Sequence, residues 1–367
     1  MMEKWHFARP ALAEQYLEIY KLGLSSNLGI IAPRRIGKTM FILRDLAPAA
    51  QKRNYVPVYA SLWQDIDTPH EGIIHALEEA IATLDGKSTI KRLLQSKIKK
   101  TTLSNEMLGK MEIEYADSAA KASKMDLVKL DQLLTTLQKK AGRKTVLLII
   151  DEVQHLATSE QFAPLSHALR TMLDKRQGSV KALFTGSSRH YMNLLFNDST
   201  SPFYHFIEIA PFPDLDMAFV EFLVIKLQND HGIVIQPKVL FNVFESIERS
   251  PYWMIKLIGH LVTFGRELKS SHKFILGLLE AAEGLVDIVK KMKPIDKIVY
   301  LALAEGESPF SQELLGRIEK ETDIRGLPSN VQRSIKRLSE RNLISQVEKG
   351  EYYIEKPGLR RYLLDSA

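Results

Sequence analysis

The chain contains no cysteine among its 367 residues, so disulfide bonds, thiolate metal sites and thiol catalysis are excluded. It also lacks a long hydrophobic run, since its longest apolar stretches, such as 146–150 (VLLII), are far too short to span a bilayer. The first ten residues, MMEKWHFARP, carry no hydrophobic segment of the kind that precedes signal cleavage. We therefore expect a soluble cytoplasmic protein with no membrane contact.

The composition is otherwise that of a globular protein. Apolar residues make up 45% of the chain, which is enough to build a full core, and the length is sufficient for two or three domains. The formal net charge of +6 favours anionic partners such as nucleic acid. Because many proteins are mildly basic without binding nucleic acid, the charge alone leaves this question open.

Hydrophobic periodicity divides the first part of the chain into alternating strands and helices. The strands are predicted at 27–31, 55–62, 145–150, 180–185 and 207–209, and the helices at 10–23, 39–50, 69–84, 125–141 and 162–176. This alternation predicts an α/β fold with a parallel sheet and helices on both faces. The polar segment 87–124, with a short hairpin considered around 111–115, has no predicted role.

The pattern changes twice further along the chain. Only helical periods occur from 216 to 284, and from 293 onward three helices precede two short strands around a Lys349–Gly350 turn. We therefore predict three domains: an α/β core over 1–212, an all-α domain over 213–288 and a small third domain over 289–367.

Residues 32–39 (APRRIGKT) nearly match the phosphate-binding loop G-x-x-x-x-G-K-[ST], and they lie between a predicted strand and a predicted helix, as that loop requires. In such a loop the backbone N–H groups and a helix N-terminus bind phosphate. Gly37 would let the backbone approach, Lys38 would reach the β- and γ-phosphates, and the Thr39 hydroxyl would ligate Mg²⁺. The predicted nucleotide-binding residues are Ala32, Pro33, Arg34, Arg35, Ile36, Gly37, Lys38, Thr39 and Met40.

Ala32 stands where the motif has its first glycine. The G-K-T end of the loop makes the phosphate contacts, and alanine is the smallest departure from glycine. The substitution is harmless if the φ angle at residue 32 is negative, and it costs about 1–2 kcal/mol if that angle must be left-handed.

Two further segments carry polar residues directly after predicted strands. Asp151 would hold Mg²⁺ through water, and Glu152 would polarise the attacking water. An ordinary solvent-facing strand end is the alternative, which the upstream phosphate loop disfavours. In 182–196, Ser187 is the first choice and Ser188 the second for a hydroxyl beside the γ-phosphate. Arg189 would add positive charge there, or is simply a surface cation at a helix start.

These residues resemble the AAA-type P-loop ATPases of the archaeal-ATPase group, close to the STAND signalling ATPases. The likeness covers about 28–285 and rests on five segments: P-R-R-x-G-K-T at 33–39, D-E-x-Q-H-L at 151–156, G-S-S at 186–188, S-P-F-Y at 201–204 and S-P-Y-W at 250–253. The resemblance implies an ATPase core and a helical lid that hold ATP or ADP with Mg²⁺. It also implies that Pro251 lies near the adenine.

The chain departs from the family pattern at two positions. One is Ala32, and the other is His205, where relatives often carry an arginine after the S-P-x-Y segment. No arginine finger acting on a neighbouring subunit is therefore expected there, and Arg170 and Arg176 are weaker candidates. Without a clear finger, a slow nucleotide-gated switch is favoured over a fast ring-shaped motor. Self-association into a homo-oligomer remains open.

Residues 294–356 resemble a winged helix, with 328–342 as the third helix. The basic residues predicted on its outer face are Arg333, Lys336, Arg337 and Arg341, whereas Val331, Ile335 and Leu338 are expected to face inward. Such a helix suits the phosphate-lined groove of duplex DNA. Contact with the ATPase core or with a protein partner is the alternative. We thus predict an ATPase whose nucleotide state repositions the winged helix, either on DNA or as a switch for a protein partner.

Overall fold

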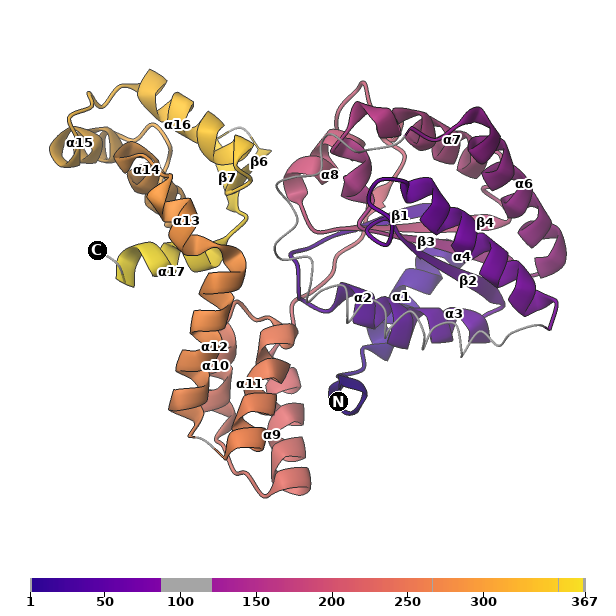
Figure 1. Ribbon diagram of the computed structural model, residues 1–367, viewed down its shortest axis with the longest axis horizontal. Helices are drawn as coiled ribbons and strands as arrows, with labels where there is room; N and C mark the ends of the chain where they lie inside the picture. The colour runs from indigo at the N-terminus through magenta and orange to yellow at the C-terminus, as the bar shows by residue number, and fades with distance from the viewer. Residues whose placement is uncertain (1, 87–120, 266, 349, 366–367) are drawn as a thin grey trace. The chain divides into compact units, whose positions relative to one another are not determined.

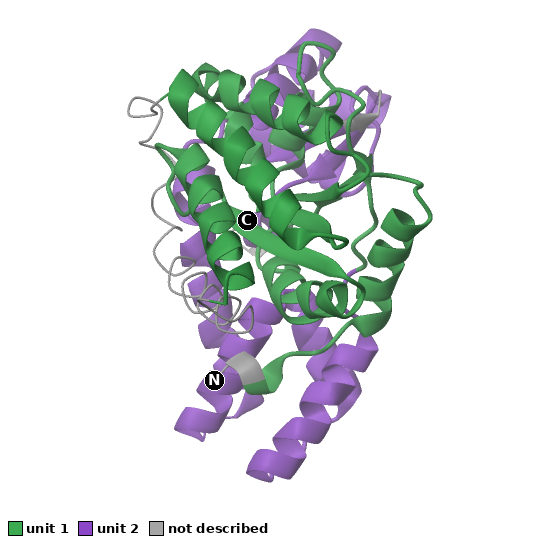
Figure 2. Ribbon diagram, turned by 90° about the vertical axis from the view of Figure 1, so that its right-hand side faces the viewer, with its two compact units in different colours: residues 1–213 green, residues 214–367 purple. Residues whose placement is uncertain are grey.

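The computed structural model describes residues 2–86, 121–265, 267–348 and 350–365. Most of the predicted polar insertion, including its considered hairpin, lies outside these ranges. The chain divides into two compact units, residues 1–213 and 214–367 (Figure 2). Within the described ranges, no helix combines the length and the apolar character needed to cross a membrane.

A five-stranded sheet forms the centre of the first unit (Figure 1). Its strand order is β2-β3-β4-β1-β5, and all of its pairings are parallel. The strands are β1 (Asn27–Ile31), β2 (Tyr55–Ser61), β3 (Thr145–Asp151), β4 (Val180–Gly186) and β5 (Glu208–Ile209). The predicted fold class, a P-loop α/β core, is confirmed.

Alternating residues of the strands fill two cores, one on each face of the sheet. In β3, Val146, Leu148 and Ile150 face one core, whereas Leu147 and Ile149 face the other. Helices cover both faces (Figure 1). The first face carries α4 (Pro69–Leu84), α6 (Lys124–Ala141), α7 (Ala163–Asp174) and α8 (Arg189–Phe196), and the second carries α1 (Pro10–Lys21), α2 (Lys38–Phe41) and α3 (Ala47–Lys52).

The helix predicted as continuous over 39–50 contains a π-helical turn, η2 (Ile42–Leu46), between α2 and α3. Pro48 explains the irregularity, because proline has no N–H group and its ring clashes with the carbonyl four residues earlier. Three short 3-10 helices, η1 (Met2–Trp5), η4 (Val153–Ala157) and η5 (Glu160–Phe162), complete the first unit's described elements.

The second unit begins with helices and ends with a small mixed module. Its first helices are α9 (Met217–His231), α10 (Pro237–Ser246), α11 (Pro251–Phe264) and α12 (Leu268–Glu283), as the helical periods predict. They are followed by α13 (Leu285–Lys290), α14 (Pro294–Ala304), α15 (Gln312–Glu321), α16 (Pro328–Glu340), the antiparallel strands β6 (Ile344–Glu348) and β7 (Glu351–Ile354), and α17 (Pro357–Asp365).

The last helix, α17, has no counterpart in the sequence prediction. It adds Leu359 and Leu363 to a core that also contains the inward-facing residues Val331, Ile335 and Leu338 of α16. The three-helix and hairpin order predicted for this region is present, but the domain boundaries near 212 and 288 stay predictions.

Candidate functional site

The strand order brings three carboxyl ends together. β4 lies between β3 and β1, and Ile31 at the end of β1 pairs with Gly186 at the end of β4. Asp151 ends β3 on the other side of β4. The phosphate-loop sequence, the acid pair and Ser187 therefore meet at one edge of the sheet, although they are far apart in the chain.

The loop between β1 and α2 has the backbone of an anion-binding turn. Gly37 has a φ of 95° and caps α2, and Arg35 also has a positive φ, of 64°. Left-handed residues in such a loop turn successive N–H groups toward one concavity. Ala32 does not adopt a positive φ, and its N–H donates to the Gly186 carbonyl at 3.2 Å. The missing first glycine therefore costs no backbone strain.

Lys38 lies inside this loop. Its side chain is buried, and its Nζ donates to the Ala32 carbonyl and, at 2.7 Å, to the Pro33 carbonyl. Burial lowers the pKa of the Lys38 ammonium, while the nearby carboxylates of Glu152 and Asp151 act in the opposite direction. The cation is thus close to the acid pair but is bonded to neutral carbonyl groups.

Asp151 is 2% exposed and accepts hydrogen bonds on both carboxylate oxygens. Thr39 Oγ1 and Tyr59 OH donate to Oδ2 at 2.8 and 2.7 Å, while Thr185 Oγ1 and the Glu152 N–H donate to Oδ1. The structure thus brings together the two predicted Mg²⁺ ligands, Thr39 and Asp151. Tyr59 and Thr185 were not identified from the sequence. The only feature that could have indicated them is a side-chain hydroxyl within a predicted strand or at its end.

Glu152 follows in a left-handed conformation, with φ 60° and ψ 40°. Its Oε2 accepts hydrogen bonds from Ser187 Oγ at 2.9 Å and from Gln154 Nε2 at 2.5 Å. Burial and, after it, the charge of Asp151 raise the pKa of the Glu152 carboxyl, against the opposing effect of Lys38 and Arg34. A partly buried acid with a left-handed backbone and a raised pKa is a typical feature of a reactive site.

The structure distinguishes between the two serines considered. Ser187 contacts Glu152, whereas Ser188 is the N-cap of α8 and accepts from the Tyr191 N–H at 3.5 Å. Arg189 is the first residue of α8. Its predicted role at the phosphoryl group stays a prediction.

Arg34 is the loop residue that reaches across to Ser187. Its guanidinium lies 4.5 Å from the centroid of the Trp63 ring, and its Nε donates to Ser187 Oγ at 3.4 Å. Trp63 was not identified from the sequence. In the same segment, Ile36 is buried and Met40 packs partly buried against the core on the α1 side of the sheet.

The two weaker candidates for an arginine finger are both engaged within the first unit. Arg170 pairs with Asp174 at 2.6 Å and lies over the Phe206 ring. Arg176 pairs with Asp131 at 2.8 Å, and its side chain is only 9% exposed. Arg176 is therefore a packing residue between α6 and α7, and its candidacy as a finger was wrong.

His155 is a structural residue of η4. Its Nε2 is 2.7 Å from the Ile66 carbonyl, and burial lowers the pKa of its imidazole. Within the described ranges, no group of three or more His, Asp or Glu side chains could hold a metal ion alone. A hydroxyl and a carboxylate, as in Thr39 and Asp151, are nevertheless the oxygen donors that Mg²⁺ prefers when it keeps most of its water and binds phosphate.

Pro251 is the first residue of α11, after the N-cap Ser250. It belongs to the second unit, and its contact with the adenine stays a prediction.

The four basic residues of α16 fall into two pairs. Arg333 and Lys336 are exposed, as predicted, and their contacts are to residues of the same helix: Arg333 donates to Asn330 at 2.9 Å, and Lys336 lies 3.9 Å from Glu340. Arg337 donates to Asp296 of α14 at 2.5 Å, and Arg341 donates to the Lys291 and Ile288 carbonyls at 3.3 and 3.2 Å. The prediction that all four present free charge to a partner thus requires correction: Arg337 and Arg341 are bound within their own unit.

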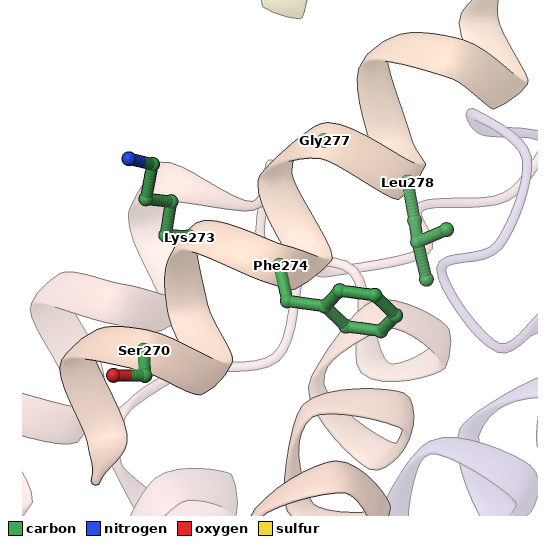
Figure 3. A pocket seen from close by; sticks show the side chains of 5 residues that line it. All are labelled: Ser270, Lys273, Phe274, Gly277 and Leu278. Carbon is green, nitrogen blue, oxygen red and sulfur yellow. The ribbon is translucent and has the colours of Figure 1, made fainter. Parts of the chain in front are cut away.

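An open pocket of about 490 Å³ lies on α12 (Figure 3). Lys273 and Ser270 point to one side of the helix, and Phe274 and Leu278 to the other. Its lining is mainly apolar, with Lys273 as the one charged side chain, so it does not have the residues of a catalytic site.

The fold is similar to that of solved structures that include a Walker-type ATPase. No protein-family model matches the chain, and no curated protein matches it significantly.

Among solved structures, the Walker-type ATPase paby2304 of Pyrococcus abyssi is 17% identical with a TM-score of 0.62, over 98% of this chain and 96% of that one. The ORC2 protein of Aeropyrum pernix, in its ADP form, is 15% identical with a TM-score of 0.55, over 97% and 91%. The same protein in ADPNP–ADP complexes is 16% identical with a TM-score of 0.52, also over 97% and 91%. At these identities the likeness establishes the fold.

Proposed function

We propose that this chain binds ATP with Mg²⁺ and hydrolyses it slowly. The observation that carries the proposal is the convergence of Lys38, Thr39, Asp151, Glu152 and Ser187 at one edge of the sheet. The structural neighbours support it, because one is described as a Walker-type ATPase and the other is known with ADP and ADPNP.

Phosphate binding would use the loop as it stands. The backbone N–H groups around Gly37 and the N-terminus of α2 offer donors to the phosphates. The Lys38 ammonium would exchange the Ala32 and Pro33 carbonyls for phosphate oxygens. Thr39 and Asp151 would hold Mg²⁺, which neutralises phosphate charge when bound.

Hydrolysis would use Glu152 to orient a water for in-line attack on the γ-phosphate. Ser187 would lie beside the γ-phosphate, and Arg34 would bring a second cation close to the same group, since it already donates to Ser187. Arg189 remains a further candidate for this charge. Because no finger residue is identified within the described ranges, turnover is proposed to be slow.

The direct test is steady-state ATP hydrolysis by the wild type and by Glu152→Gln. The variant keeps the phosphate loop and is expected to bind ATP, but to lose at least 100-fold in turnover, because no carboxylate orients the water. Equal turnover by the two proteins would contradict the assignment.

We further propose that the nucleotide state changes the position of the winged-helix-like module and that α16 contacts duplex DNA. Arg333 and Lys336 carry this part, because they are exposed on the helix that would enter the groove. Replacing both by alanine is expected to weaken duplex binding and to reduce the slope of log affinity against log salt by about 2. The matched control replaces two exposed lysines of α12, Lys269 and Lys273.

A switch that gates a protein partner is the second candidate. The engagement of Arg337 and Arg341 within their own unit favours it, because only half of the predicted cationic face is left for phosphate contacts. ATP turnover that duplex DNA stimulates would support the DNA-associated function. Turnover that is indifferent to DNA, together with no salt-dependent duplex binding, would support the switch.

A further inference from the structure

Gln154 is a buried polar residue that the proposed mechanism does not use. It belongs to η4, lies two residues after Glu152 and is 4% exposed. Its carboxamide Nε2 is 2.5 Å from Glu152 Oε2 and 3.1 Å from Ser187 Oγ. One nitrogen thus contacts both the carboxylate that would orient water and the hydroxyl that would lie at the γ-phosphate.

The chemistry of these neighbours fixes the orientation of the carboxamide. A carboxylate is an acceptor only, so the nitrogen and not the oxygen of Gln154 must face Glu152. The NH₂ group has two protons, which is one for each of its two acceptors. Ser187 donates its own proton to Glu152 Oε2 at 2.9 Å, so the three side chains form a closed triangle of hydrogen bonds.

Packing holds Gln154 in this place. A Cβ atom added at Gly186 would come within 2.8 Å of Gln154 Oε1 and within 2.2 Å of Met192 Sδ. The end of β4 therefore needs glycine directly before Ser187 for the carboxamide to fit. Gln154 Oε1 itself is buried without a hydrogen-bond partner among the described residues. A buried polar atom left unpaired in this way is unfavourable for stability and is tolerated where a side chain serves function.

We propose that Gln154 is the positioning residue that sets Glu152 and Ser187 as one unit, so that a contact of Ser187 with the γ-phosphate is transmitted to the carboxylate that orients water. If the Ser187 hydroxyl turns its proton toward a phosphate oxygen, Glu152 loses that donor. Gln154 then keeps the Glu152 carboxylate and the Ser187 hydroxyl in their relative positions, since it continues to donate to each of them. The inference deepens the proposed ATPase function and rests on it.

The test uses Gln154→Met in the full chain, because methionine has a similar length and no N–H donor. We expect kcat for ATP to fall about tenfold or more, while KM stays within about threefold, because the variant misplaces the carboxylate without touching the phosphate loop. The matched control is Ser166→Ala, which removes a buried hydroxyl that donates only to the Phe162 carbonyl and lies outside the site. The control should keep the wild-type kcat.

A double-variant cycle separates positioning from a general structural role. In the Glu152→Gln background, Gln154→Met should lower the single-turnover rate by less than about twofold, because the group it positions is already gone. A full tenfold loss in both backgrounds would overturn the inference, since Gln154 would then act without Glu152. Wild-type kcat in Gln154→Met would also overturn it.

The outcomes distinguish this inference from the function on which it rests. If the wild type hydrolyses ATP and Gln154→Met does so at the same rate, the positioning role fails and the ATPase assignment stands. If the wild type does not hydrolyse ATP, or does so no faster than Glu152→Gln, both the ATPase function and the positioning role of Gln154 are contradicted. Melting temperatures and binding of a fluorescent ATP analogue, measured for every variant, exclude unfolding as the cause of a lost rate.

Discussion

Each of the two units buries an aspartate that is 2% exposed, but the two surroundings differ. In the second unit, Asp296 accepts from Ser334 at 2.6 Å and forms a direct ion pair with Arg337 at 2.5 Å. In the first unit, Asp151 accepts only from hydroxyls and a backbone N–H, and it stands next to a second acid, Glu152. The nearby cation, Lys38, donates to carbonyl groups instead.

The pKa directions follow from these surroundings. Burial raises the pKa of the Asp296 carboxyl, but the hydrogen bonds from Arg337 and Ser334 outweigh it and leave that pKa below its usual value. Burial and Asp151 together raise the pKa of Glu152. Asp296 therefore has a direct charged partner, whereas the hydrogen bonds that Asp151 and Glu152 accept come from neutral donors, as the proposed nucleotide site requires.

The largest expected effect is the loss of nucleotide binding when Lys38, the cation beside Asp151 and Glu152, is removed. Lys38→Ala should abolish nucleotide binding, with a loss of at least 100-fold in affinity for a fluorescent ATP analogue, because the one buried cation of the loop disappears. Stability without nucleotide should change little, since the ammonium donates only to carbonyl groups. Lys336→Ala, an exposed lysine of α16, serves as control. If Lys38→Ala still bound the ATP analogue, the proposal that the surroundings of Asp151 form a nucleotide site would be contradicted.

In the second unit, removal of the buried aspartate should reduce stability and leave ATP turnover unchanged. Asp296→Ala leaves Arg337 and Ser334 without their acceptor and should lower the free energy of unfolding by about 2 kcal/mol, with unchanged ATP turnover. Urea unfolding of the full chain measures the loss. The control is Glu340→Ala, which removes an exposed acid of α16, the helix that carries Arg337 and Ser334, and should leave the unfolding midpoint unchanged.

The contribution of Asp296 should also depend on pH with a definite sign. Its folded-state pKa lies below its unfolded value, so its stabilisation is present above about pH 4 and disappears as the pH falls through the folded-state pKa. The stability difference between the wild type and Asp296→Ala should therefore shrink below about pH 4. A difference that persists down to pH 2 would mean that the charge of Asp296 is not what stabilises this contact.

A smaller effect of opposite direction is expected for Glu152. Because the folded state raises its pKa, its ionisation costs stability, and this cost is present at neutral pH and disappears as the pH falls. Glu152→Gln should therefore stabilise the nucleotide-free chain by about 1 kcal/mol while lowering turnover at least 100-fold. Thermal melting without Mg²⁺ or nucleotide measures this change in stability. A lower melting temperature for Glu152→Gln would show that the ionised Glu152 stabilises the fold, as Asp296 does.

The smallest effect concerns the backbone of the phosphate loop. Ala32→Gly restores the glycine of the motif, yet it should destabilise the chain by about 0.5 kcal/mol, because residue 32 does not need a positive φ. Arg35→Gly, at φ 64°, should relieve strain by a similar amount if the arginine side chain is not required. A gain in stability from Ala32→Gly would mean that the loop is strained at its first position.

A site residue could be predicted from the sequence when its role depends on residues near it in the chain, and not when it depends on contacts with distant ones. Lys38, Thr39, Asp151 and Glu152 belong to short motifs whose role follows from local geometry at strand ends, and the structure brings them together as expected. Tyr59, Thr185 and Trp63 could not be found in this way. Each contacts the site only because of how the strands are ordered, and nothing in its immediate neighbours marks it.

The misjudged residues have the same explanation. Arg176, Arg337 and Arg341 are basic positions on helices, and helical periodicity indicates which side they face but not what lies opposite. The structure places Asp131 against Arg176, Asp296 against Arg337, and backbone carbonyls against Arg341. The helix α17 was missed because it is short and its two buried leucines are interpretable only once the core they complete is known.

The sequence by itself determined the α/β core, its order of strands and helices along the chain, and the phosphate loop with its acid pair, because these depend on local periodicity and on residues adjacent in the chain. Only the tertiary structure decided that Ala32 is unstrained, that Ser187 rather than Ser188 contacts Glu152, and that Gln154 joins the two. The physical reason is the parallel sheet: it places β4 between β1 and β3, and a strand order of that kind is fixed by packing and not by neighbouring residues.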